Sequence, residues 1–422
     1  MITAVMFGAG GRGMQAYGPY ALEHPEELRF VAVAEPDPDR RARFAAMHNI
    51  PPERQYTTWE DAISVGKLAD AVFNCTVDQM HTASTLAAMD AGYEVLLEKP
   101  IAHTTAETVQ LVRAAETQGR LLQICHVLRY TAFFQKVREI VQSGRLGDII
   151  NVDHRENLIF WHMAHSFVRG NWRNTETSAP MILAKCCHDL DILGWILGQP
   201  VERLSSFGSL LHFTPANAPD GAPQRCTDGC PAADWCKFYA PRLYAHDGSR
   251  FHLNAVTYEP TAAARMARLE TDSPYGRCVY HCDNNVVDHQ AVSMALAGGT
   301  TVTLMMQGHG YEEGRTMRYD GTRATLQGRF AGEQKLTIRD HRTSGVEQIQ
   351  IETGNASGHG GGDFGLVRSF LNAMNGQPDD RLTSAQVSLE SHLLAFAAEQ
   401  ARLESSVIDM ADFRREAEAL VH

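Results

Sequence analysis

The sequence predicts an α/β protein with an N-terminal Rossmann domain, which has a doubly wound parallel sheet, and a C-terminal α+β domain with a large open, mostly antiparallel sheet. Up to about residue 125, buried-strand runs alternate with helix-like segments, a pattern that implies a parallel sheet covered by helices. A glycine-rich turn follows the first of these strands. After about residue 150, apolar and polar residues alternate, as in strands with one exposed face. We therefore expect domains at residues 1–125 and 126–422.

The amino-acid composition and charge indicate what kinds of partner the protein binds. The 422 residues are 44% apolar, and the net charge of -12 comes from dispersed acidic residues without a basic run. This distribution argues against nucleic acid and membrane surfaces as partners and favours small molecules. Strand-like residues begin at Met1 without a signal sequence, and no apolar run approaches the ~20 residues that cross a bilayer. We expect a cytoplasmic protein whose nine cysteines are thiols, metal ligands or catalytic groups rather than disulfides.

The glycine-rich turn has the spacing GxGxxG between the strand Ile2–Phe7 and a helix-like run over 14–23. Its first glycine permits a tight turn, its second lets the backbone approach a pyrophosphate, and its third lets helix and strand pack closely. The N-terminus of the helix favours the phosphate charge. We expect a dinucleotide to lie against Gly8, Gly10, Gly11, Arg12 and Gly13.

A second buried strand, 30–34, ends in Glu35 at the distance where a ribose-binding acid is expected. A carboxylate there accepts hydrogen bonds from ribose hydroxyls and repels a 2′-phosphate, which favours NAD over NADP. Two alternatives stay open: Arg40 and Arg41 could bind a phosphate, or Glu35 could be an ordinary charge at a strand end.

The rest of the first domain continues the βα alternation. A strand ends in the turn Thr76–His81, and another ends in Glu98-Lys99-Pro100, which delivers a carboxylate and an amine to the edge of the sheet where α/β enzymes do chemistry. The expected elements are helix 37–47, strand 71–75, helix 82–91, strand 94–97, a helix capped at Thr104, and strand 121–125.

These motifs, in this order, resemble the glucose-fructose oxidoreductase / inositol dehydrogenase (Gfo/Idh/MocA) family. The similarity continues in 128–130, 143–149, 171–173 and 187–191, and so covers essentially the whole chain. The resemblance implies an NAD(P)-dependent oxidoreductase that acts on the CH–OH group of a sugar, polyol or glycoside. It also implies a homodimer or homotetramer through the C-terminal sheet. We expect Thr76, His81, Glu98 and Lys99 as further cofactor-binding residues.

The resemblance also suggests the catalytic residues. It places Lys99 near the nicotinamide and the reacting hydroxyl, where a cation stabilises developing alkoxide. His188, on an expected helix over 182–197, corresponds to the family's general base or acid, and an imidazole suits proton exchange near neutral pH. The acid that the family often has four residues earlier is replaced by Ala184.

Lys185 is the nearby charge instead, and we expect it to share a helical face with His188 and Asp189 and to keep the imidazole neutral. Asp189 is a candidate substrate ligand. Alternatively, Lys185 and Asp189 form an ordinary surface pair.

Aromatic and histidine side chains gather in a loop-like segment before that helix, as in sites that bind polyols. Histidines after the sixth strand and beside a late glycine run are further candidates, although each could be structural. The candidate substrate-binding residues are His126, Arg129, His162, His165, Asn171, Trp172, Arg173, Asp189 and His359.

A proline-rich insertion at 213–244 contains three cysteines, Cys226, Cys230 and Cys236. With Cys278 or Cys282 as a fourth ligand they could bind a structural zinc ion, although free thiols or a redox role remain alternatives. A late helix at 382–404 is expected to pack back on the body.

The function predicted from the sequence is NAD-dependent oxidation or reduction of a carbohydrate hydroxyl. Two alternatives stay open. A redox-neutral glycosidase would oxidise, eliminate, add water and return the hydride, and a regulatory protein would sense NAD without turnover.

Overall fold

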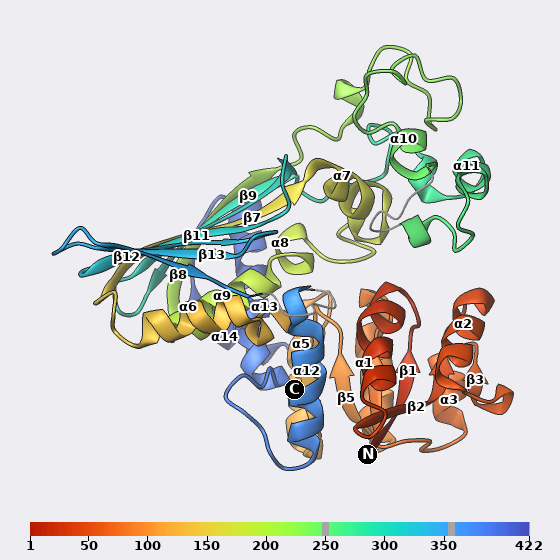
Figure 1. Ribbon diagram of the computed structural model, residues 1–422, viewed down its shortest axis with the longest axis horizontal. Helices are drawn as coiled ribbons and strands as arrows, with labels where there is room; N and C mark the ends of the chain where they lie inside the picture. The colour runs from red at the N-terminus through yellow and green to blue at the C-terminus, as the bar shows by residue number, and fades with distance from the viewer. Residues whose placement is uncertain (247–252, 353–358, 422) are drawn as a thin grey trace.

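The computed structural model describes residues 1–246, 253–352 and 359–421. The first domain holds a six-stranded parallel sheet in the order β3-β2-β1-β4-β5-β6, which confirms the predicted Rossmann topology. Its apolar strands are almost wholly buried because helices cover both faces (Figure 1). The strands are β1 (Ile2–Phe7), β2 (Leu28–Ala34), β3 (Gln55–Tyr56), β4 (Ala71–Asn74), β5 (Glu94–Leu97) and β6 (Leu122–Ile124); the helices are α1 (Gly18–Glu23), α2 (Pro38–His48), α3 (Trp59–Ser64), α4 (His81–Asp90) and α5 (Thr105–Gln118).

The second sheet has nine strands in the order β14-β13-β12-β11-β7-β10-β9-β8-β15. Its described pairs are antiparallel except for β7 with β10, so the expectation of a mostly antiparallel sheet is confirmed. The strands are β7 (Ile149–Ile159), β8 (Val201–Ser209), β9 (His289–Leu296), β10 (Thr301–Gly310), β11 (Gly314–Gly321), β12 (Ala324–Phe330), β13 (Lys335–Asp340), β14 (Val346–Gln350) and β15 (Val407–Asp409).

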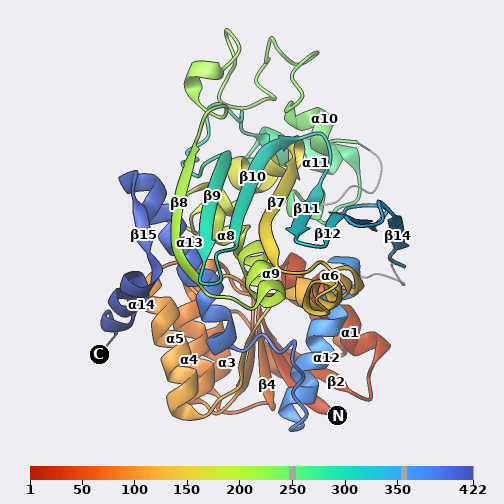
Figure 2. The same ribbon diagram turned by 90° about the vertical axis from the view of Figure 1, so that its left-hand side faces the viewer.

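Helices pack against one face of this sheet, and Figure 2 looks onto the other face, where β8, β9 and β10 lie in front of the helices. Alternating burial follows from this arrangement, because inward side chains such as Leu204 are buried while Phe207 is 70% exposed. The helices are α6 (Ala132–Gln142), α7 (Phe160–His162), α8 (Met181–Ala184), α9 (Cys187–Leu197), α10 (Ala240–Tyr244), α11 (Ala262–Glu270), α12 (Gly362–Met374), α13 (Ala385–Glu404) and α14 (Met410–Ala419). Among the described residues, no helix is both long and apolar enough to span a bilayer.

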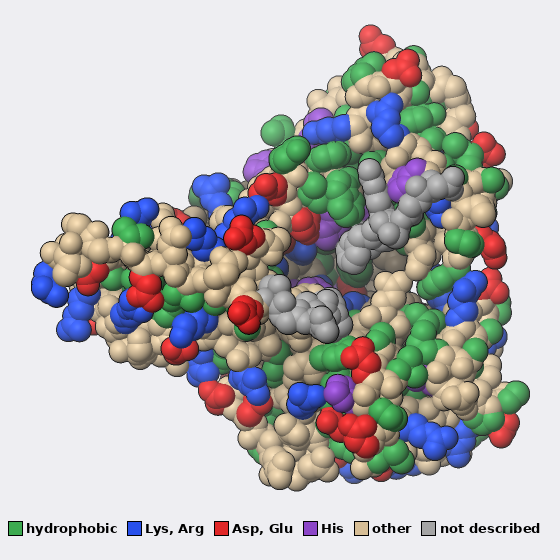
Figure 3. Space-filling model, viewed as in Figure 1, with side chains coloured by type: hydrophobic (Ala, Val, Ile, Leu, Met, Phe, Trp, Pro, Cys, Tyr) green, Lys and Arg blue, Asp and Glu red, His purple; other side chains and the backbone are tan. Residues whose placement is uncertain are grey.

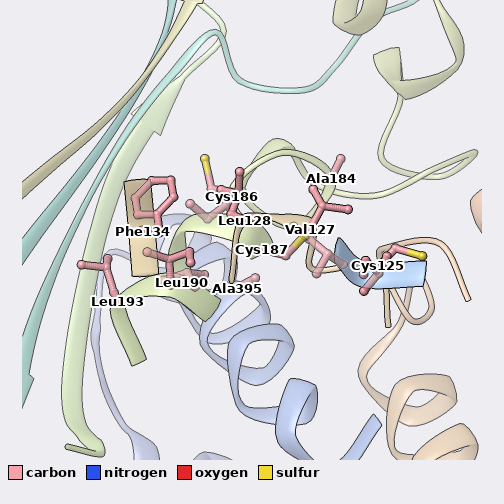
Figure 4. Packing of buried hydrophobic residues seen from close by; sticks show 14 of the residues in the cluster. Cys125, Val127, Leu128, Phe134, Ala184, Cys186, Cys187, Leu190, Leu193 and Ala395 are labelled. Carbon is pink, nitrogen blue, oxygen red and sulfur yellow. The ribbon is translucent and has the colours of Figure 1, made fainter. Parts of the chain in front are cut away.

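The apolar core beneath this sheet is centred on α9. Its residues are buried on nearly every side, and Figure 4 shows Leu190 and Leu193 packed among side chains from neighbouring helices. The expected helix over 182–197 is in fact two helices, because the chain breaks at Lys185 and Cys186. The expected late helix begins at Ala385, after Ser384 caps its N-terminus.

The β8–β9 insert, described over residues 210–246 and 253–288, contains the proline-rich insertion expected at 213–244 (Figure 1, upper right). Its described part includes α10 and α11 and has a small core of its own. That core consists of Cys226, Ala240, Tyr244, Leu253, Val256 and Leu269.

Candidate active site

The glycine-rich turn is closed where the chain must be tight and open where a ligand would approach. Gly8 has φ +83°, and a Cβ atom there would lie 2.4 Å from the Cys75 carbonyl oxygen. A Cβ atom on Gly13 would lie 2.4 Å from the Gly8 carbonyl oxygen, whereas nothing lies within 4 Å of one on Gly10 or Gly11. The turn therefore fits the pyrophosphate of a dinucleotide.

Glu35 lies against this turn at the end of β2. One carboxylate oxygen accepts from the Ala9 backbone N–H at 2.7 Å, and the other accepts from the Asp37 N–H at 3.0 Å. Arg41, considered above as a phosphate ligand, donates instead to the main-chain carbonyl groups of Glu35 and Pro36. This arrangement leaves an acid rather than a cation at the position expected for the ribose.

Arg12 and Glu98, both expected to contact the cofactor, are largely engaged with each other. The Arg12 Nε atom lies 2.5 Å from Glu98, and its Nη2 atom lies 2.7 Å from Asp363 on α12. Glu98 is buried and also accepts from the Tyr17 hydroxyl at 2.5 Å and the Lys99 N–H at 3.1 Å. The Glu98 carboxylate therefore holds the two turns of the site together, and its contact with the cofactor stays a prediction.

Burial and neighbouring charges shift the pKa of Glu98 in opposite directions. Burial alone would raise the pKa of Glu98, but Arg12 and Lys99 outweigh burial and lower that pKa. The carboxylate is ionised and keeps the Arg12 guanidinium in place.

His81 has a positioning role in this structure, while its contact with the cofactor stays a prediction. Its side chain is fully buried, with Nδ1 2.7 Å from the Pro100 carbonyl oxygen and Nε2 3.1 Å from the Thr76 carbonyl oxygen. The imidazole thus fastens the turn after β4 to the turn after β5, where the Lys99–Pro100 peptide bond is cis. Thr76 is half-buried, and its hydroxyl donates to Asn74 at 2.8 Å.

Lys99 crosses from the first domain to the second. Its ammonium group donates to the Ala184 carbonyl oxygen at 2.8 Å and lies 6.0 Å from the centre of the Trp172 ring. Trp172 in turn directs its indole N–H toward Asp78 at 3.4 Å, and Asp78 accepts from Ser178 at 2.6 Å. The segment around Trp172 is therefore tied to the Rossmann domain.

His188 lies in the same region, near the N-terminus of α9. Its Nδ1 atom is buried and has no hydrogen-bond partner among the described residues. Its ring lies 5.6 Å from that of His126 and 6.3 Å from that of His359, measured between ring centres. Burial, then Lys99 and His126, hold the pKa of His188 well below its usual value, so the imidazole is neutral.

The largest charge effects on the pKa of His188 come from Lys99 and His126. That Lys185 also keeps this imidazole neutral stays a prediction. The Lys185 ammonium lies 3.2 Å from Glu156 and 3.7 Å from Glu313. Burial alone would lower the pKa of Lys185, but these two acids raise it. Lys185 is therefore a cation held by Glu156 on β7 and by Glu313 in the turn between β10 and β11.

Asp189 is not a surface partner of Lys185. Its side chain is fully buried and accepts from Arg315 Nε at 2.7 Å, with His154 Nε2 also 2.7 Å away. Asp189 therefore pairs with Arg315 and His154 rather than with Lys185, and its role as a substrate ligand stays a prediction. The helix break at Lys185 turns it and Asp189 toward different partners.

The other candidate substrate-binding residues differ in how far they are buried. Arg129 is buried in an ion pair with Asp191 at 2.6 Å, and His126 and His165 are also buried, the latter stacked on Tyr275. The role of these three residues in substrate binding stays a prediction. The more accessible candidates are Asn171, Trp172, Arg173, His162 and His359, of which His162 pairs with Glu313 at 2.8 Å and Arg173 pairs with Asp283 at 2.7 Å.

The sequence reasoning missed the acids that hold Lys185. Glu156 and Arg315 face each other in the register of β7 and β11, and their side chains approach to 2.7 Å. Polar residues at buried positions of an alternating strand, such as His154 and Glu156, were the available signal. Figure 3 shows histidine and basic side chains at a hollow between the upper and lower parts of the molecule.

The expected zinc site is not formed. Four sulfur atoms that bind zinc tetrahedrally lie about 3.8 Å apart, since each Zn–S bond is about 2.3 Å. Among the described residues, the one group of three or more such ligand atoms within 4.8 Å of one another is His24, Glu26 and Glu27. The sulfur of Cys282 lies instead 3.2 Å from the Cys278 carbonyl oxygen.

Comparisons with known proteins agree with this geometry. The family model described as "Oxidoreductase family, NAD-binding Rossmann fold" matches residues 2–126, and that of the "GFO/IDH/MocA C-terminal domain" matches residues 134–327. The 1,5-anhydro-D-fructose reductase of Ensifer adhaerens is 31% identical over 255 residues, which are 58% of this chain and 74% of that enzyme.

Two further relatives were found. The inositol 2-dehydrogenase of Leifsonia xyli is 29% identical over 205 residues, which are 46% of this chain and 55% of that enzyme. The structure of an inositol dehydrogenase homolog complexed with NAD+ from Azotobacter vinelandii has a TM-score of 0.70 at 17% identity, with 97% of each chain covered. This last similarity shows a shared fold.

Proposed function

This chain belongs to the Gfo/Idh/MocA family of NAD-binding oxidoreductases, and from this premise we propose that it oxidises or reduces a secondary hydroxyl group of a sugar, polyol or glycoside. The observation that carries the proposal is the pairing of a cation, Lys99, with a buried neutral imidazole, His188, at the junction of the two domains. When bound, the nicotinamide carries the hydride.

The protein's own groups handle the proton. The neutral His188 accepts the hydroxyl proton through a ring nitrogen as the C–H bond is broken. The Lys99 ammonium stabilises negative charge on that oxygen, because a preorganised cation in a partly dry site interacts strongly with developing charge. In the reductive direction His188 returns the proton and Lys99 polarises the carbonyl.

A cyclic polyhydroxylated substrate is supported by the side chains around these two residues. Trp172 offers an apolar ring face, while Lys185, His162 and His359 offer polar groups that can bind several hydroxyls. The curated relatives act on compounds of this kind, namely inositol and anhydrofructose.

NAD is the preferred nucleotide in this proposal. The Glu35 carboxylate lies beside the glycine-rich turn, while Arg41 is bonded to main-chain carbonyl groups. A ribose hydroxyl can donate to Glu35, whereas a 2′-phosphate would meet its negative charge.

Nicotinamide fluorescence and absorbance test the proposal in two steps. Titration with NADH should show binding, and incubation with NAD and a panel of cyclic polyols and glycosides should produce NADH. Absence of NADH binding would overturn the proposal. Binding without turnover on any compound would favour the NAD-sensing alternative.

A second candidate function, the redox-neutral glycosidase, is favoured by the acid–base groups near Lys185. Burial raises the pKa of Glu156 despite the nearby Arg315 and Lys185, so this carboxyl group adds to the acid–base groups of the site. With catalytic NAD in deuterated water, this candidate requires glycoside cleavage, no net NADH, and deuterium beside the oxidised carbon. Net NADH without cleavage would exclude it.

We also propose that copies of the chain associate through the outer face of the nine-stranded sheet, where Phe207 is 70% exposed. Light scattering would give the mass in solution, and Phe207→Asp should lower it. An unchanged monomeric mass for both proteins would refute this interface.

A further inference from the structure

The four cysteines that the sequence singled out line one cavity in the β8–β9 insert. Its lining includes the side chains of Cys226, Cys230, Cys236, Cys278 and Arg169. All four cysteines are free thiols. The cavity belongs to a different part of the molecule from Lys99 and His188, and the proposed function does not use it.

Main-chain hydrogen bonds bring these cysteines together from distant parts of the chain. Cys226 N–H donates to the Gly276 carbonyl at 2.9 Å, and Cys278 N–H donates to the Gln224 carbonyl at 2.9 Å. A turn between the other two cysteines is closed by the Cys236 N–H, which donates to Ala232 at 2.9 Å. The loop is thus shaped around the cavity although it contains little regular secondary structure.

Arg169 brings a buried positive charge to the same cavity. It is fully buried, and its guanidinium donates to the carbonyl oxygens of Arg277 and Phe238 and, at 3.5 Å, to the sulfur of Cys226. Its Nη1 atom has no partner, and no carboxylate of the described residues pairs with it. A buried cation of this kind requires a negative charge nearby, which four neutral thiols do not supply.

We propose that this cavity binds a [4Fe–4S] cluster through Cys226, Cys230, Cys236 and Cys278. Four cysteine thiolates are the usual ligands of such a cluster. Each thiolate binds a different iron at the corners of a cube, so the cysteine sulfurs lie farther apart than around a single zinc ion. This spacing agrees with a cavity in which no three of these sulfurs lie within 4.8 Å of one another.

Assembly from equal amounts of ferrous and ferric iron with sulfide forms one Fe–S bond per cysteine and releases the thiol protons to solvent. The supplied iron already has the oxidation states of the cluster, so no further oxidant is needed and the nicotinamide takes no part. The completed cluster and its thiolates carry a net negative charge, which balances Arg169.

The cluster would fix the segment that carries Trp172. Arg169 ends the helical turn η5 (Met163–Arg169), and its carbonyl oxygen accepts from Arg277 Nη2 at 3.2 Å, one residue from Cys278. The next turn, η6 (Asn171–Arg173), places Trp172 over Lys99. The cluster therefore has a structural role, holding the insert against the active site.

The test is to purify the full chain without oxygen, both as isolated and after reconstitution with ferrous iron, ferric iron and sulfide. We expect about four iron atoms and about four acid-labile sulfide ions per chain, with visible charge-transfer absorbance that dithionite bleaches. Iron below about one atom per chain in both samples would overturn the proposal. Tight binding of about one zinc ion without iron would overturn it as well.

Two cysteine variants locate the site. Cys230→Ser should lose most of the iron and sulfide, whereas Cys282→Ser should keep both, because Cys282 does not line the cavity. Equal iron contents in the two variants would contradict the assignment of ligands. Circular dichroism of each variant separates loss of the cluster from loss of the fold, and the wild-type stoichiometry stands independently of both.

Discussion

The Lys99 ammonium donates a hydrogen bond of 2.8 Å to the carbonyl oxygen of Ala184 and so joins the end of β5 to the end of α8. Ala184 stands where the resembled family often has an acid, so the lysine meets a neutral main-chain acceptor instead. Its charge is not cancelled by this partner. The ammonium is therefore able both to stabilise an alkoxide and to lower the proton affinity of His188.

Replacing Lys99 with alanine should lower turnover by about 100-fold, because the developing charge on the substrate oxygen loses its cation. NADH affinity should change little, since the glycine-rich turn is untouched. Steady-state kinetics and fluorescence titration measure the two quantities. Wild-type turnover in this variant would assign Lys99 a purely structural role.

Lys99→Ala should also change the way in which the rate of oxidation depends on pH. Burial and Lys99 lower the pKa of His188, so in the wild type the base stays neutral well below pH 6.5. Without the ammonium that pKa rises, and oxidation should begin to fail at a higher pH than in the wild type. The pH at which kcat/KM falls on the acidic side reports this pKa. If it is the same in the variant and the wild type, Lys99 does not lower the pKa of His188.

His188→Asn should also lower turnover by about 100-fold, because no other group takes its place as proton acceptor. His165→Asn is a matched control, since His165 is buried beside Tyr244 and Tyr275 in the β8–β9 insert. Equal activity of the two variants would show that His188 is not the base.

Glu35→Gln should reduce the preference for NAD over NADP by about tenfold or more, because the charge that opposes a 2′-phosphate is lost. Glu53→Gln, at an exposed position, should leave the preference unchanged. The measurement is the ratio of the dissociation constants for NADP and NAD in each variant. A ratio unaffected by Glu35→Gln would transfer the selectivity to another residue.

Two alanine substitutions separate folding from binding in the glycine-rich turn. Gly10→Ala should keep the melting temperature and weaken NADH binding, because its Cβ would enter the space left for the pyrophosphate. Gly8→Ala should destabilise the protein by about 1 kcal/mol or more, since its φ is positive and its Cβ would strike the Cys75 carbonyl. Calorimetry and fluorescence titration distinguish the two, and equal melting temperatures for both variants would refute the contrast.

The Rossmann topology was predictable because its signals are local: a buried strand, a glycine turn and a helix follow one another along the chain. The surroundings of Lys185 were not predictable from the sequence. Its partners come from β7 and from the turn before β11, and their contact with the end of α8 depends on tertiary packing. The helix break at Lys185 and Cys186 also lacks a local signal, because neither residue is a strong helix breaker.

The cysteines form an intermediate case. Their number and spacing predicted that they would gather, and the structure brings Cys226 and Cys278 to one cavity. Sequence spacing does not specify the distance between sulfurs, however. This distance distinguishes a zinc site from the wider site of a [4Fe–4S] cluster.

The bond between Arg12 and Asp363 has a consequence for protein engineering. The nucleotide-binding turn and helix α12 share one guanidinium although 351 positions separate the two residues. A chimaera that takes only residues 1–125 from a relative would inherit the arginine without the acid that holds it, unless the recipient supplies one. Transplants of cofactor preference should therefore carry this distant residue along with the turn.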